Sequence, residues 1–155
     1  MPRAPGYYRH PTIHRDRIVF VCEDDLWSVT TCGGPATRLT ASAGSATFPV
    51  LSPDGKTIAF TGQDDGPTEA WVMDTDSGTA ERRSHFGGML RTVAWTPDSD
   101  NVVVQSHYGQ AFRSDLRLWH LPALRGHARA LRHGPSKEIA YHPRSSPVVL
   151  GINAG

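Results

Sequence analysis

Cysteine, net charge and long apolar runs are all scarce in this sequence of 155 residues. Two cysteines, Cys22 and Cys32, are too few for a disulfide framework, so we expect reduced thiols. Sixteen basic residues nearly balance fifteen acidic ones, which leaves no electrostatic basis for binding nucleic acid or an anionic membrane. No apolar run approaches the roughly 20 residues of a transmembrane helix, and residues 1–10 lack the apolar segment of a secretory signal. We therefore expect a cytoplasmic chain without a nucleic-acid or membrane partner.

Helical periodicity is missing as well. No segment keeps a 3.6-residue apolar period over ten residues, and the 15 glycines and 12 prolines interrupt every candidate. Short β-branched strands are present instead, each followed by a charged turn and a strand that contains tryptophan. The first set is expected at 18–21, 58–61 and 102–105, and the tryptophan strands at 26–29, 70–73 and 118–121. The sequence therefore predicts an all-β protein.

The tryptophan strands recur at a nearly constant interval. Trp27 and Trp71 are 44 residues apart, and Trp71 and Trp119 are 48 apart, so the third repeat contains four extra residues, expected near Tyr108–Ser114. A period in the mid-forties with several short strands is typical of propeller blades. We predict a partial β-propeller with about three four-stranded antiparallel blades and the start of a fourth. The domain covers 1–155, with blades at about 12–47, 48–91 and 92–138 and the next beginning at 139–155.

Turn motifs mark the strand boundaries. Ser52-Pro53-Asp54-Gly55 precedes the strand at 58–61, and Thr96-Pro97-Asp98-Ser99, 44 residues later, precedes the strand at 102–105. Proline presets φ in a tight turn, aspartate caps it, and glycine accepts a positive φ. A degenerate copy, Tyr141-His142-Pro143-Arg144, is expected to open the fourth blade. Such an array cannot close a ring by itself, so we expect exposed strand edges and apolar faces.

Three segments resemble known families. The hairpin sequence at 48–60 resembles the repeat of Tol-B and prolyl-oligopeptidase propellers. The sequence at 11–27, which ends in IVFVCEDDLW, and the following GGPATRLT at 33–40 resemble the start of tricorn proteases. The resemblance covers nearly all of this chain but only the beginning of the family's domain plan.

The resemblance implies a parent protein that is a cytoplasmic, homo-oligomeric serine peptidase acting on oligopeptides. Its catalytic residues would lie in a C-terminal region outside this sequence, so we assign no catalytic, cofactor-binding or metal-binding residue here. The expected role is a non-catalytic propeller segment that gates substrates and serves as a scaffold. Expected partners are peptide substrates and either the rest of the polypeptide or another chain that completes the propeller. The alternatives are a stand-alone Tol-B-like scaffold and the propeller cap of a prolyl-oligopeptidase relative.

Several motifs suggest chemistry but have simpler interpretations. Gly55-Lys56-Thr57 lacks the first glycine of a phosphate-binding loop and is expected to be a turn. Asp74 and Asp76 lack the glycine and glutamate spacing of a calcium loop, and no G-x-S-x-G nucleophile motif occurs. The eight histidines are expected to be scattered over surfaces and blade edges rather than to bind a metal ion. Glu23-Asp24-Asp25 is expected to solvate a hairpin, with contact to a peptide N-terminus as the alternative, and the three in-phase tryptophans are expected to pack between blades.

Overall fold

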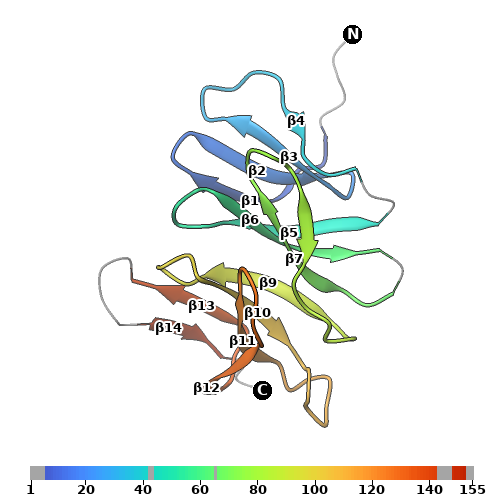
Figure 1. The fold of residues 1–155 in the computed structure, drawn as a ribbon, viewed down its shortest axis with the longest axis vertical. Helices are drawn as coiled ribbons and strands as arrows, with labels where there is room; N and C mark the ends of the chain where they lie inside the picture. The colour runs from blue at the N-terminus through green and yellow to red at the C-terminus, as the bar shows by residue number, and fades with distance from the viewer. Residues whose placement is uncertain (1–5, 42–43, 65, 143–147, 153–155) are drawn as a thin grey trace.

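The computed structural model describes residues 6–41, 44–64, 66–142 and 148–152. This part of the chain contains fourteen strands and no helix, in three four-stranded antiparallel sheets and one two-stranded hairpin. Each sheet is an up-and-down meander whose strands pair in chain order, because short charged or Gly/Pro turns join consecutive strands. The sheets stack side by side along the molecule (Figure 1). The all-β partial propeller predicted from the sequence is confirmed.

The strands of the first sheet are β1 (Arg9–His14), β2 (Arg17–Cys22), β3 (Asp25–Thr30) and β4 (Thr37–Arg38). Those of the second are β5 (Ser45–Leu51), β6 (Thr57–Gln63), β7 (Glu69–Asp74) and β8 (Ala80–Arg82). Those of the third are β9 (Leu90–Trp95), β10 (Asn101–Ser106), β11 (Arg117–Pro122) and β12 (Arg129–Pro135). The hairpin consists of β13 (Glu138–Tyr141) and β14 (Val148–Gly151). The last expected turn motif extends into residues 143–147, which lie outside the described residues.

The connection between the second and third strands lengthens from sheet to sheet. It comprises residues 23–24 in the first sheet, 64–68 in the second and 107–116 in the third. The extra residues of the third repeat therefore lie in the β10–β11 connection, as the spacing predicted. The β6–β7 connection is also longer than its counterpart in the first sheet. Tryptophan spacing could not show this, because the β2–β3 connection precedes Trp27, the first tryptophan of the series.

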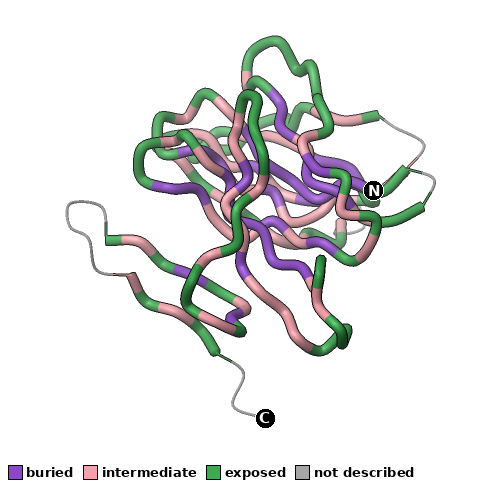
Figure 2. Tube along the Cα trace, turned by 60° about the horizontal axis from the view of Figure 1, so that its bottom comes forward, coloured by how far each residue is buried: buried purple, intermediate pink, exposed green. Residues whose placement is uncertain are grey.

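Three apolar cores lie between neighbouring sheets rather than within one continuous centre. The first joins sheets one and two and includes Val19, Leu26 and Phe60; the second joins sheets two and three through residues such as Ala59 and Trp95. A smaller third core joins sheet three to the β13–β14 hairpin. Buried segments accordingly lie inside the stack, and the hairpin carries mainly intermediate and exposed residues (Figure 2). Strand alternation places one set of side chains on each face of a sheet, so both faces of an inner sheet can be buried.

Candidate functional site: an axial pocket on the innermost strands

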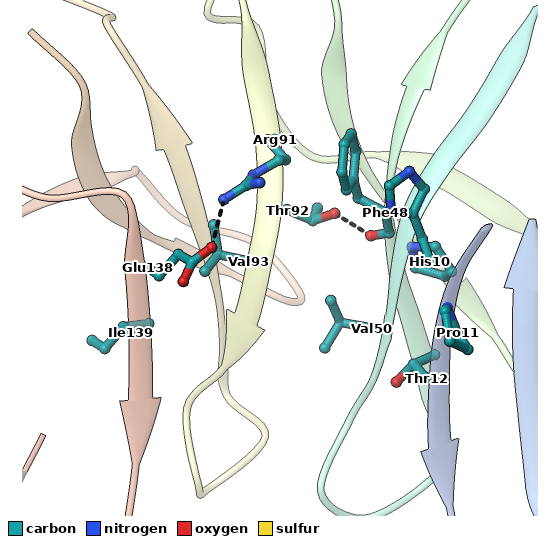
Figure 3. A pocket seen from close by; sticks show the side chains of 11 residues that line it. His10, Pro11, Thr12, Phe48, Val50, Arg91, Thr92, Val93, Glu138 and Ile139 are labelled. Atoms are coloured by element: carbon teal, nitrogen blue, oxygen red, sulfur yellow. Dashed lines mark hydrogen bonds and ion pairs between the residues drawn. The ribbon is translucent and has the colours of Figure 1, made fainter. Parts of the chain in front are cut away.

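The first strands of the four units, β1, β5, β9 and β13, lie next to one another and line a common pocket. The pocket has a volume of about 440 Å³ and is open to solvent on one side. The side chains that line the pocket come from these four first strands (Figure 3). Its lining residues are His10, Pro11, Thr12, Phe48, Pro49, Val50, Arg91, Thr92, Val93, Glu138 and Ile139.

Bulges aim side chains into this pocket. His10 has a φ of 49°, Phe48 also has a φ of 49°, and each precedes a proline at a shift in strand register. A positive φ is uncommon for residues other than glycine, and a bulge turns a side chain away from the regular alternation. The two rings consequently meet across sheets one and two, with centroids 4.1 Å apart.

Arg91 connects the second sheet, the third sheet and the hairpin. Its guanidinium carbon lies 5.4 Å from the centroid of the Phe48 ring, in a cation–π arrangement. On the other side, one guanidinium nitrogen lies 3.8 Å from a carboxylate oxygen of Glu138 and donates a 3.4 Å hydrogen bond to the carbonyl of Lys137. Thr92 donates from its hydroxyl to the carbonyl of Phe48, which fixes the spacing of the two inner strands (Figure 3).

The electrostatics of the pocket are mixed. Burial lowers the pKa of His10, and the positive charges of Arg9 and Arg91 lower that pKa further. His10 is therefore neutral near pH 7, and Arg91 and Glu138 contribute one charge of each sign. Aromatic, prolyl and threonyl side chains make up most of the wall, and the described lining has no serine, cysteine or lysine.

Most of the motifs noted in the sequence are turns in the structure. Gly55 and Lys56 lie in the β5–β6 turn and Thr57 begins β6. In this turn the Asp54 carboxylate accepts hydrogen bonds from the Ser52 hydroxyl and the Lys56 amide. These hydrogen bonds lower the pKa of Asp54. Asp74 likewise accepts hydrogen bonds from the amides of Asp76 and Ser77, which closes the β7–β8 turn and lowers its pKa. Neither segment is arranged as a phosphate or calcium loop.

The histidines do not gather at one place. His10 lies in the axial pocket, and His120 lies between the third sheet and the hairpin, where its Nε2 is 2.9 Å from the Tyr141 hydroxyl. Within the described ranges, no group of three or more histidine, cysteine, aspartate or glutamate residues could hold a metal ion.

The acidic run at 23–25 requires a correction. Glu23 and Asp24 form the exposed β2–β3 turn as expected, and Asp24 pairs with Arg9 at 2.7 Å. Asp25 is instead buried, and it accepts hydrogen bonds from Arg38 and from the Thr40 hydroxyl. The run therefore does not simply solvate a hairpin, because Asp25 anchors the outer strand β4 through Arg38 and the segment after it through Thr40.

The second sheet repeats this buried carboxylate. Glu69 accepts hydrogen bonds from the Ser84 hydroxyl and from the amides of Phe86 and Gly87. A signal for this site is present in the sequence but was not recognised from its motifs. An acidic residue lies two positions before the tryptophan, and a serine or threonine lies thirteen positions after it. Asp25 and Thr40 flank Trp27 in this way, as Glu69 and Ser84 flank Trp71.

The three in-phase tryptophans pack unequally. Trp71 lies against the core between sheets one and two, and Trp119 lies against the core between sheets two and three. Both are only partly buried, and Trp27, in the equivalent position of the first sheet, joins none of the three cores. The inter-blade packing expected of Trp27 is therefore not seen in the part of the chain that the structure describes, where no sheet lies on that side of it.

No helix within the described residues is long and apolar enough to span a membrane.

The family profile of the tricorn protease N-terminal beta propeller domain matches residues 5–153. This match distinguishes the tricorn-type interpretation from the Tol-B-like and prolyl-oligopeptidase alternatives that the repeat alone left open.

Individual relatives agree with this assignment. The chain is 37% identical over 147 residues to Tricorn protease homolog 1 of Streptomyces coelicolor, covering 93% of this chain and 14% of that protein. It is 30% identical over 142 residues to a putative Tricorn-like protease N-terminal subunit of Sulfurisphaera tokodaii, covering 87% of this chain and 70% of that protein.

The crystal structure of the tricorn protease has the same fold, with a TM-score of 0.81 at 24% identity over 90% of this chain and 14% of that one. The chain thus spans about one seventh of the length of the Streptomyces relative and of the crystallised protease. On the profile match and these relatives together, the chain belongs to the family of tricorn protease N-terminal β-propeller domains.

Proposed function

We propose that this chain is a non-catalytic propeller segment of a tricorn-type serine peptidase, where it gates the access of oligopeptides and serves as a scaffold. The parent enzyme would act in the cytoplasm as a homo-oligomer, with catalytic residues outside this sequence. The observation that carries the proposal is the axial pocket, to which the innermost strands of all four units contribute. A passage at the centre of a propeller is built from those strands.

The wall of the pocket supports a gating role. Phe48, Pro11 and Pro49 give it rigid apolar surface, and the pocket remains open rather than filled by side chains. Glu138 extends into it from an exposed strand position and meets Arg91 only at 3.8 Å, so this side of the opening is adjustable. Exposed ion pairs at such distances contribute little stability and rearrange readily.

Buried hydroxyl groups elsewhere have structural partners, which supports a non-catalytic segment. Ser52 hydrogen-bonds Asp54, Ser84 hydrogen-bonds Glu69, and the Ser106 hydroxyl donates to the carbonyl of Met89. A nucleophilic serine needs an adjacent base and an open approach for substrate, and these three side chains are almost fully buried.

Gating is tested in the intact protein that contains this chain by changing the size of residue 138. Glu138→Trp should narrow the pocket and lower kcat/KM for an oligopeptide of eight residues by about tenfold, which is about 1.4 kcal/mol in activation free energy. A single-residue amide substrate should be turned over at the unchanged rate, because it is small enough to pass.

The matched control is Glu138→Gln, which removes the charge at nearly constant size and should leave both substrates unaffected. An equal loss for long and short substrates would show general damage, and no loss for either would contradict gating. The scaffold role has a separate check in the native size of the polypeptide. An antibody against residues 23–40 should detect a band roughly seven times the 16.9 kDa of this chain if the parent resembles the Streptomyces relative.

A further inference from the structure

A small pocket lies between the first and second sheets and is separate from the axial pocket. Its volume is about 190 Å³, and it shares no lining residue with the axial pocket. Residues from the segment after β4 and from β6, β7 and β8 line it. Its apolar lining includes Leu39, Phe60, Trp71, Met73 and Ala80. The pocket, here called the inter-sheet pocket, thus lies inside the stack of sheets rather than at either end of it.

Two aromatic side chains form a wall of this pocket. Phe60 and Trp71 are direct partners across β6 and β7, and their rings lie nearly parallel, with 18° between the ring planes and 6.4 Å between the centroids. Gly62 makes room for the indole, since a Cβ atom there would lie only 2.5 Å from Cδ1 of Trp71. Aromatic rings attract a further ring in edge-to-face or offset-stacked geometry. The wall is therefore suited to an aromatic partner.

The interface between the second and third sheets shows what such a wall accepts. Trp119 lies 48 residues after Trp71 and occupies the equivalent strand of the third sheet. Phe86 meets Trp119 edge-on, with centroids 5.4 Å apart, and stacks on Tyr108 with centroids 4.4 Å apart. Tyr108 also meets Trp119 edge-on at 5.5 Å. The chain thus supplies two rings of its own to this tryptophan.

The equivalent positions at the interface between the first and second sheets supply no ring. Tyr108 comes four residues after the strand partner of Trp119, and the residue in that place relative to Trp71 is Asp64. The residue 44 positions before Phe86 is a serine, which lies outside the described residues and has no ring to contribute. Asp64 and Trp71 both line the inter-sheet pocket. The pocket therefore lies where the other interface holds its two rings.

We propose that the inter-sheet pocket binds a small monocyclic aromatic compound of the phenol class, whose ring packs against Phe60 and Trp71. The size fits, because an apolar protein cavity of about 150 Å³ holds benzene and this pocket is only slightly larger. Ser45 begins β5, and Asp64 follows β6 at the same end of that strand pair. Both line the pocket, where they would bind the hydroxyl group of the ligand. This site is separate from the axial pocket, so the inference does not depend on the proposed function.

The test uses phenol as the probe and the intact protein that contains this chain. Saturation-transfer NMR of the ligand should show saturable binding with a Kd on the order of 1 mM. Ala80→Phe should weaken binding about tenfold or more, because Ala80 lines the pocket and the added ring would take the place of the ligand. The matched control is Thr79→Phe, whose neighbouring position does not line this pocket, and it should bind phenol like the wild type. Both positions are exposed, so both variants should fold.

Cyclohexanol tests the preference for an aromatic ring, because it has a similar size and a hydroxyl group but no π-system. It should bind about fivefold more weakly than phenol, and equal affinities would overturn the aromatic selectivity. A wild-type protein without saturable phenol binding overturns the proposal, as does an Ala80→Phe variant that binds phenol like the wild type. Equal losses in Ala80→Phe and Thr79→Phe also overturn it, since they would trace binding to the β7–β8 turn rather than to the pocket.

Discussion

The first and second sheets have nearly the same arrangement of side chains but bury them differently. Phe20 pairs with Trp27 on one sheet and Phe60 pairs with Trp71 on the other. Phe60 is 4% exposed because the first sheet covers it, whereas Phe20 is only partly buried because no sheet of the structure lies beyond it. Strand alternation thus determines which side a residue faces, and the neighbouring sheet determines whether it is buried. Stability in this molecule comes from contacts between sheets.

The largest expected effect separates these two phenylalanines. Phe60→Ala should lower the free energy of unfolding by about 3–5 kcal/mol, because it removes a buried ring from the first core. Phe20→Ala should cost about 1 kcal/mol, since its ring is only partly buried and joins none of the three cores. Urea unfolding of both variants at low protein concentration measures the difference. Equal losses would contradict the comparison by showing that the face carrying Phe20 is covered in solution.

Local sequence patterns were sufficient to predict the strands and turns. The β-branched segments and the Ser-Pro-Asp-Gly turn each depend on a few adjacent residues, and the tryptophan spacing is read directly from the sequence, so all three were readable without the structure. The partial burial of Trp27 was not predictable in this way, because it depends on whether another sheet packs against that face. Asp25 was misread for a similar reason, since its partners Arg38 and Thr40 lie on the next strand and beyond it.

The axial pocket was missed altogether by the sequence analysis. It depends on bulges at His10 and Phe48 and on four strands coming together in space. One local signal was present: both residues precede a proline within an innermost strand. Proline restricts the residue before it and removes a backbone donor, so a repeated X-Pro pair within a strand indicates a bulge.

A second comparison concerns the buried carboxylates of the same two sheets. Glu69→Ala should destabilise the chain by about 2–3 kcal/mol, because it leaves the Ser84 hydroxyl and the amides of Phe86 and Gly87 without an acceptor. Asp25→Ala should cost about 1–2 kcal/mol, since Arg38 and Thr40, the side chains it releases, reach water more easily. Chemical denaturation of the two variants in parallel would reveal the order. A larger loss for Asp25→Ala would contradict it and would identify the outer strand of the first sheet as the more important attachment.

The smallest expected effect concerns the contact between the third sheet and the hairpin. Tyr141 and His120 form a 2.9 Å hydrogen bond there. Burial raises the pKa of Tyr141 and lowers the pKa of His120. The negative charge of Asp98 partly offsets the lowering of the His120 pKa. Near pH 8 both groups are neutral, so the tyrosine hydroxyl can donate to the imidazole. Tyr141→Phe should therefore cost about 0.5–1.5 kcal/mol in unfolding free energy at that pH.

Acidification should reduce this difference between Tyr141→Phe and the wild type. The folded-state pKa of His120 lies below its unfolded value of about 6.5, so the unfolded chain binds the additional proton first as the pH falls. The stabilisation from neutral His120 is therefore complete above that value and is lost as the pH falls through the folded-state pKa. Protonated Nε2 can no longer accept a hydrogen bond from Tyr141, so the two chains should converge near pH 5. Tyr8→Phe, at an exposed ring, controls for removal of a hydroxyl group and should show no such pH dependence. A Tyr141→Phe deficit that persists unchanged at pH 5 would place its origin in packing rather than in the hydrogen bond to His120.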